Sequence, residues 1–108
     1  MIEVTVSRSG KGEPLRLTVS GHAGRGPYGS DVVCAAASAL VETLRIGFER
    51  VLRQPYQGAI EEGAADLAWT VPLSSEARAV VETICQALRD LAATEPTAVR
   101  YREISEQG

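Results

Sequence analysis

The sequence predicts an α+β fold, a two-layer sandwich of a mostly antiparallel sheet with two helices, in the order ββαββαβ. Two pairs of short segments alternate apolar and polar residues across glycine-containing turns, as in hairpins. Two longer stretches place apolar residues at helical spacing. Because hairpins dominate, the sheet should be largely antiparallel, with the helices packed on it. The 108 residues fit one domain, residues 1–108.

The N-terminal segment predicts the first hairpin. Residues 2–7 alternate apolar and polar side chains with the two-residue period of a half-buried strand, and residues 15–20 do the same. The stretch between them, residues 9–14, contains Gly10 and Gly12 and is typical of a turn. We therefore expect the chain to open with two paired strands.

An alanine-rich stretch then predicts a long helix from Val32 to about Leu52. Asp31 stands directly before it and is a favourable residue type for the N-cap. Pro55 limits the C-terminal end, because proline cannot continue a helix. Gly47 is the weakest position inside the predicted helix.

The second half of the chain repeats the pattern of hairpin and helix. Residues 56–61 and 66–71 predict two strands joined by a turn at residues 62–63, and Trp69 is expected to pack in the core. Ser74 or the serine after it is suited to cap the second helix. The apolar stripe of that helix consists of Ala77, Val80, Val81, Ile84, Leu88 and Leu91. Residues 99–104 predict the last strand.

Composition excludes several function classes. The net charge is −3 and the arginines are spread along the chain, which disfavours direct nucleic-acid binding. No apolar run approaches the ~18 residues of a membrane span. One histidine and two separated cysteines make no metal-ligand cluster, so no metal is expected. The N-terminal segment does not have the pattern of a signal peptide, so we expect a cytoplasmic protein with free thiols.

Cys34 and His22 are the candidate nucleophile and base. The predicted helix start places Cys34 in the first turn, where unpaired N–H groups and the helix dipole stabilise a thiolate and suit an oxyanion hole. His22, the only histidine, follows the second predicted strand. The loop between them carries Gly21, Gly24, Gly26 and Gly29. Folding back of this loop would bring the imidazole within hydrogen-bond reach of the sulfur.

Neighbouring residues have two interpretations each. Cys34 itself is also compatible with a small core residue, whereas Cys85, beside Ile84, is expected to be structural. Asp31 either caps the helix or orients the imidazole, as the third member of a catalytic triad does. Ser38, one helical turn after Cys34, is either a small packing residue or a hydroxyl that faces the same pocket.

The loop also matches a different motif. Residues Gly24 to Gly29 read G-x-G-x-x-G between a strand and a helix, as in dinucleotide-binding sites. That motif belongs to a parallel βαβ unit, whereas this chain opens with a hairpin. The motif match still gives phosphate or nucleotide binding by this loop as an alternative function, although the surrounding elements differ from those of dinucleotide-binding sites. The loop is otherwise a flap that closes on a peptide, or a turn that needs glycine.

The segment from Gly21 to Leu40 resembles the ribosomal-processing cysteine protease family, Prp, also called YsxB-like. The resemblance is carried by GHA at residues 21–23 and by G-x-D-x-V-C-A-A at residues 29–36, and it extends over the chain in length and element order. It implies a homodimeric α+β cysteine endopeptidase without a cofactor. The implied substrate is the N-terminal extension of a large-subunit ribosomal protein.

The resemblance also implies residue roles. The family's nucleophile falls on Cys34, its base on His22, its motif aspartate on Asp31 and a small hydroxyl position on Ser38. Family members cleave after an aromatic segment, which implies a hydrophobic subsite near the Cys34 helix, under the glycine-bearing loop. The chain departs from the family pattern at Pro27 and at Glu42 to Gly47. A ribosome-assembly or peptide-binding module that holds the extension without cutting it is the non-catalytic alternative.

Overall fold

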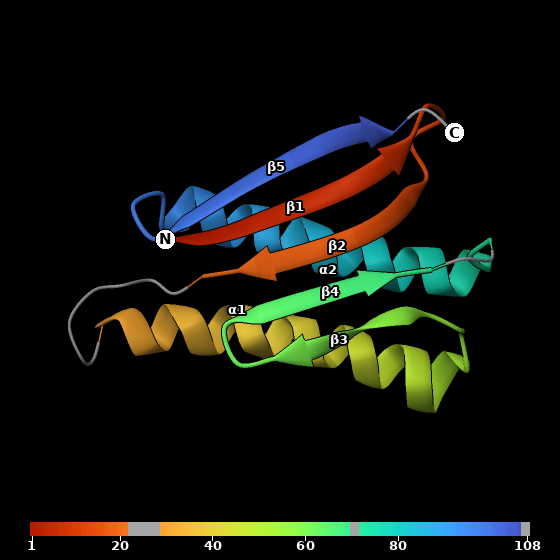
Figure 1. The fold of residues 1–108 in the computed structure, drawn as a ribbon, viewed down its shortest axis with the longest axis horizontal. Helices are drawn as coiled ribbons and strands as arrows, with labels where there is room; N and C mark the ends of the chain where they lie inside the picture. Colours follow the sequence, from red (N-terminus) through yellow and green to blue (C-terminus); the bar gives the residue numbers. More distant parts are fainter. Residues whose placement is uncertain (22–28, 70–71, 107–108) are drawn as a thin grey trace.

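The computed structural model describes residues 1–21, 29–69 and 72–106, with the backbone alone for residues 29–31. The elements are β1 (Ile2–Ser9), β2 (Pro14–Ser20), α1 (Gly29–Ile46), the π-helix η1 (Gly47–Leu52), β3 (Gln57–Glu61), β4 (Ala64–Ala68), α2 (Ser75–Thr94) and β5 (Val99–Glu106), as Figure 1 shows. This confirms the predicted order ββαββαβ and the α+β class.

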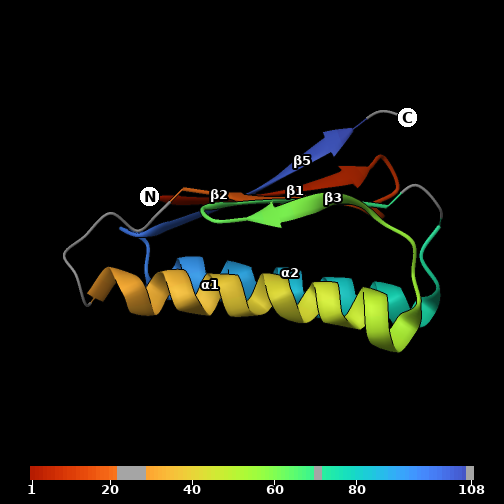
Figure 2. The same cartoon turned by 60° about the horizontal axis from the view of Figure 1, so that its bottom comes forward.

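The five strands form one sheet in the order β3-β4-β2-β1-β5. Each neighbouring pair is antiparallel except β1 and β5, which are parallel, so the prediction of a mostly antiparallel sheet is confirmed. Both helices lie on the same face of the sheet, as Figure 2 shows from the side. The parallel pair arises because α2 carries the chain back along the sheet before β5 begins.

The hydrophobic core lies between the sheet and the two helices. The two-residue period of the strands turns every second side chain toward the helices, and one apolar face of each helix packs against these side chains. The buried side chains include Ile2, Val4, Val6, Leu17, Leu67 and Val99 from the sheet, and Val33, Ala37, Val41, Leu44, Ala77, Val81, Ile84 and Leu88 from the helices. The alternation in the sequence therefore identifies the core face correctly.

The first helix begins earlier than its predicted start. α1 starts at Gly29, so Asp31 lies in the first turn of the helix rather than in front of it. Polar residues are tolerated in a first turn because the first N–H groups of a helix have no partner within the helix. The positive end of the helix dipole also stabilises an acidic residue there. From Gly47 the chain continues as η1, which ends at Leu52 as predicted, with Arg53 in a left-handed conformation (φ 54°).

The second hairpin and helix have the predicted organisation with shifted bounds. β4 ends at Ala68, and residues 70–71 of the predicted strand lie outside the described residues. Trp69 is buried, as expected, and its Nε1 donates a hydrogen bond to the carbonyl of Pro14. Ser74 is the N-cap of α2, and its hydroxyl accepts a hydrogen bond from the Ala77 N–H at 3.1 Å, as predicted.

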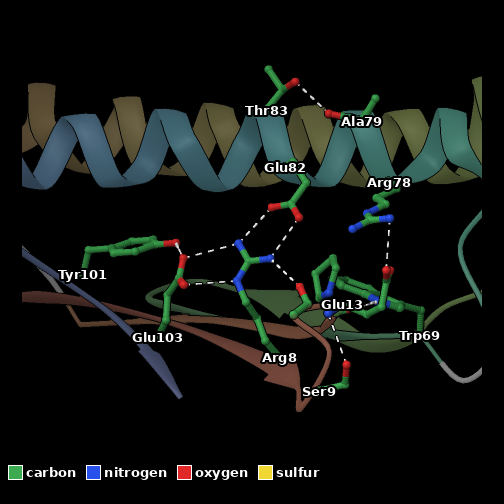
Figure 3. A network of polar contacts seen from close by, with 12 residues as sticks. Arg8, Ser9, Glu13, Trp69, Arg78, Ala79, Glu82, Thr83, Tyr101 and Glu103 are labelled. Carbon is green, nitrogen blue, oxygen red and sulfur yellow. Dashed lines mark hydrogen bonds and ion pairs between the residues drawn. The ribbon is translucent and has the colours of Figure 1, made fainter. Parts of the chain in front are cut away.

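A network of polar contacts centred on Arg8 joins the two layers at the β5 edge (Figure 3). The Arg8 guanidinium donates to both carboxylate oxygens of Glu82 on α2, at 2.8 and 2.9 Å, and through Nε to Glu103 on β5 at 3.1 Å. The Tyr101 hydroxyl donates to Glu103 at 2.6 Å. The two carboxylates, that of Glu82 most of all, raise the pKa of Arg8. The pKa of Glu103 is lowered, chiefly by the hydrogen bond from the Tyr101 hydroxyl and next by that from Arg8.

Replacing Arg8 with methionine should lower the free energy of unfolding by about 2 kcal/mol, because the ion pairs with both Glu82 and Glu103 are lost and the two carboxylates keep no cation between them. The Arg8 side chain is only 19% exposed, so water replaces these contacts poorly. Urea unfolding at pH 7 measures the effect. Arg100→Met is the control, since Arg100 is 65% exposed and pairs with Glu3 at 3.4 Å, and it should cost far less. Equal losses in the two variants would contradict this account.

The same network gives a pH dependence with a definite sign. The pKa of Glu103 is lower in the folded chain than its ordinary value, so its contribution to stability is present above the ordinary pKa and is lost as the pH falls through the folded value. The difference in stability between the native protein and Arg8→Met should therefore shrink on acidification. A difference in unfolding free energy between the two proteins that stays the same from pH 7 to acidic pH would contradict this expectation.

Candidate active site

A pocket of about 510 Å³ lies between the first helix and one end of the sheet. Its lining comes from the start of β1, the end of β2, one face of α1 and the turn between β3 and β4. The residues are Ile2, Val19, Gly21, Cys34, Ala37, Ser38, Val41, Glu42, Ile60, Glu61, Glu62, Gly63, Ala64 and Ala65. Three of the residues expected at the site, Gly21, Cys34 and Ser38, are therefore brought together here.

The helical period explains the α1 side of the pocket. Cys34, Ala37, Ser38, Val41 and Glu42 follow one another at intervals of three, one, three and one residues, which places them on one face of a helix. Cys34 and Ser38 are one turn apart on that face. The interpretation of Ser38 as a residue of the same pocket agrees with this placement.

The sheet side of the pocket is held by Gly21. Its N–H donates a hydrogen bond to the carbonyl of Gly63 at 3.0 Å, which joins the end of β2 to the β3–β4 turn. Gly21 has a φ of +93°, and a Cβ on it would overlap the carbonyl oxygen of Met1. A side chain is excluded at this position for both reasons. The glycine thus permits a close approach of three backbone segments at the pocket wall.

Cys34 lies deeper in its helix than predicted. Because α1 begins at Gly29, Cys34 belongs to the second turn, and the prediction that it lies in the first turn is wrong. The effect of the helix dipole falls off within the first turn, and the unpaired N–H groups belong to the first four residues. Cys34 therefore lies beyond the unpaired N–H groups with which the sequence prediction associated it.

The two cysteines differ in their surroundings. Neither forms a disulfide, and Cys34 is half-buried at the pocket. Cys85 is 2% exposed in the core, and desolvation raises the pKa of its thiol to about 12. A thiol with such a pKa stays protonated at neutral pH and is a poor nucleophile. This agrees with the expectation that Cys85 is structural.

Several predicted site residues lie outside the described part of the chain. His22, Gly24 and Gly26 fall within residues 22–28, and for Gly29 and Asp31 only the backbone position in α1 is described. The contact between His22 and Cys34, the orienting role of Asp31 and the nucleotide-binding alternative for the loop therefore stay predictions.

Sequence reasoning missed the contribution of the β3–β4 turn. Glu61 and Glu62 reach the pocket because β4 pairs with β2, and no local sequence pattern predicts that pairing. Glu42 was also missed, although its position eight residues after Cys34 on the same helix would have found it. These three carboxylates give the pocket an acidic character.

The described residues contain neither a candidate metal site nor a helix that could span a membrane. No group of three or more histidine, cysteine, aspartate or glutamate side chains among them is arranged to hold a metal ion. None of the helices in this part of the chain has the length and hydrophobicity needed to cross a membrane.

The comparison with protein families decides the relationship. The model of the family described as cysteine protease Prp matches residues 1–100. The chain belongs to the cysteine protease Prp family. Membership in this family makes it a cysteine protease, the enzyme class that the sequence predicted.

Solved structures share the fold of the Prp family with this chain. The ribosomal processing protease Prp from S. aureus with a covalently linked product peptide is 22% identical, with a TM-score of 0.86 and coverage of 95% of this chain and 99% of that one. The same protease with a substrate peptide gives 21% identity, a TM-score of 0.85 and the same coverage. SMU.848 from Streptococcus mutans is 26% identical, with a TM-score of 0.83 and coverage of 98% and 96%. The search of curated proteins gave no match.

Proposed function

We propose that this protein is a cysteine endopeptidase that removes the N-terminal extension of a large-subunit ribosomal protein, with Cys34 as nucleophile and His22 as base. The observation that carries the proposal is the position of Cys34 in the wall of a 510 Å³ pocket, together with membership in the Prp family. His22 follows Gly21, which lines the same pocket, directly in the chain.

The proposed reaction has two halves. The Cys34 sulfur attacks the carbonyl carbon of the scissile peptide bond while the His22 imidazole takes the thiol proton, and the imidazolium then gives this proton to the leaving amine. The thioester that results is hydrolysed by a water molecule whose proton passes to the same imidazole. The products are two peptides and the free thiol, and no cofactor takes part.

The supporting residues have roles in the same scheme. Asp31 orients the imidazole and stabilises its protonated form, and the Ser38 hydroxyl offers a hydrogen bond to the bound peptide. The loop with Gly21, Gly24, Gly26 and Gly29 closes over the substrate. The S. aureus protease of the same fold was crystallised with a substrate peptide and with a covalently linked product peptide, which supports a peptide as the ligand.

The pocket suits part of the implied substrate. Its lining includes apolar side chains from β1, β2 and α1, namely Ile2, Val19 and Val41. An apolar or aromatic segment of the extension would bury hydrophobic surface there. The proposal also includes a homodimer, as the resemblance implies, and a cytoplasmic location, as expected from the N-terminal segment.

Incubation with a synthetic peptide tests the function. The peptide spans the N-terminal extension and the first residues of the mature ribosomal protein from the same organism, and the products are identified by mass spectrometry. We expect two fragments whose masses sum to that of the peptide plus one water. Protein alkylated beforehand with iodoacetamide is the control and should leave the peptide intact. An intact peptide after prolonged incubation with the untreated protein would contradict the proposal.

A further inference from the structure

The two free edges of the sheet differ in how they are protected. β3 and β5 are the outer strands of the order β3-β4-β2-β1-β5. β5 has the sequence VRYREISE, in which four residues are charged, and charged edge strands discourage the addition of a further strand. The middle of β3 is uncharged, and Gly58 and Ala59 are exposed there with little or no side chain. The edge of β3 is therefore open to another extended segment.

The hairpin register turns the backbone of Ile60 outward. Glu61 and Ala64 are the last pair before the two-residue turn, and a closing pair of this kind exchanges the hydrogen bonds of the turn. Because pairs alternate along antiparallel strands, the next pair, Ile60 and Ala65, forms none between its members. The N–H and C=O of Ile60 therefore point away from β4. In the described part of the chain, no hydrogen bond from a loop or a side chain reaches them.

The side chain of Ile60 leads from this edge into the candidate pocket. Ile60 lies opposite Ala65, which lies opposite Val19 of β2. All three residues line the pocket that contains Cys34, so they form a row across the helix-facing side of the sheet. Figures 1 and 2 both show α1 alongside β3. A residue of an added strand opposite Ile60 would continue this row and direct its side chain into the pocket.

We propose that the substrate peptide binds as a further strand on the free edge of β3, with its backbone hydrogen-bonded to the N–H and C=O of Ile60. One side chain of the peptide then extends the row of pocket residues toward Cys34. In this mode of recognition the main-chain hydrogen bonds supply affinity for an extended peptide, and the pocket receives alternate side chains. An extended peptide is the occupant, because the open edge is continuous with the pocket of the assigned nucleophile. This inference rests on the proposed function and adds how the substrate is held.

Hydrogen exchange followed by NMR tests the position of the peptide. The experiment uses the Cys34→Ala variant, which leaves the extension peptide uncut, with and without that peptide at saturation. We expect exchange of the Ile60 amide to slow by about tenfold or more on binding, because its N–H gains an acceptor. The Tyr101 amide is the control at the other edge. The Ile2 N–H donates to the Ala98 carbonyl, so alternation along the parallel pair turns Tyr101 away from β1, and its exchange should stay the same.

Backbone methylation of the peptide tests the hydrogen bonds from the other side. A series of extension peptides, each with one backbone nitrogen methylated, is titrated into the Cys34→Ala variant. In an added strand only every second N–H faces the neighbouring strand. We therefore expect methylation at alternate positions near the scissile bond to weaken binding about tenfold, and methylation at the intervening positions to have little effect.

Three results would overturn the inference. They are an Ile60 amide whose exchange does not change when the peptide is bound, equal effects of methylation at neighbouring nitrogens, and absence of binding. An Ile60 amide that already exchanges slowly without peptide would also overturn it, since the edge would then be occupied, for example by β3 of a second copy. Failure of the proposed protease function is recognised separately, because it leaves the extension peptide intact with the unmodified protein.

Discussion

Replacing Cys34 with alanine is expected to lower kcat for cleavage of the extension peptide by about 10⁴-fold or more. Removal of a nucleophile from a covalent mechanism eliminates the intermediate itself, so its effect exceeds that of losing a single binding contact. The side chain lines the pocket and is only partly buried where it packs against the edge of the core, so the shortening to alanine should change the free energy of unfolding little. Single-turnover cleavage followed by mass spectrometry measures the rate.

Cys85→Ala is the matched control for this variant. It removes the other thiol of the chain, which is buried and whose pKa is raised to about 12. We expect it to keep the rate of cleavage while losing some stability, because a small void is left in the core. A Cys34→Ala protein that cleaves at the normal rate, or a Cys85→Ala protein that is folded but inactive, would refute the assignment of the nucleophile.

Replacing Phe48 with alanine should cost about 3–5 kcal/mol of unfolding free energy, the range for loss of a buried aromatic ring. Phe48 is 1% exposed in η1, and its ring lies 5.6 Å from that of Trp69 and 5.9 Å from that of Tyr56. The variant leaves a cavity between the helical layer and the sheet. Trp69 is the only tryptophan, so its fluorescence during urea unfolding reports on this region.

Val51→Ala supplies the comparison within the same π-helix. Val51 is 75% exposed, and its substitution should change the unfolding free energy by no more than about 0.5 kcal/mol. A loss in Phe48→Ala as small as that in Val51→Ala would show that the aromatic cluster does not stabilise the fold as its burial indicates.

Local patterns in the sequence were sufficient for the order of the elements. Alternation marked the strands, and the Ser74 cap and the stripe of α2 marked the second helix. The start of α1 was misjudged because residues 29–31 are polar or glycine, and such residues are accepted in a first turn without any apolar signal. That error carried over to Cys34, which lies one turn further into the helix than expected.

Only the α1 side of the pocket can be predicted from the sequence, because the other side depends on how the strands pair. Cys34 and Ser38 share a helix face, so their proximity follows from the helical period alone. The β3–β4 turn reaches them only through the pairing of β4 with β2, a contact between segments far apart in the chain. Sequence patterns specify each strand but not its neighbour in the sheet, so Glu61 and Glu62 could not be assigned to the site.

The position of the N-terminus beside the pocket has a practical consequence for recombinant work. Ile2 lines the pocket, and the carbonyl of Met1 lies against Gly21. An affinity tag joined ahead of Met1 would therefore begin next to the wall of the candidate pocket. β5 ends at the other end of the sheet, where Glu106 is paired with Ser9 (Figure 1), so a tag placed after this strand starts far from the candidate pocket.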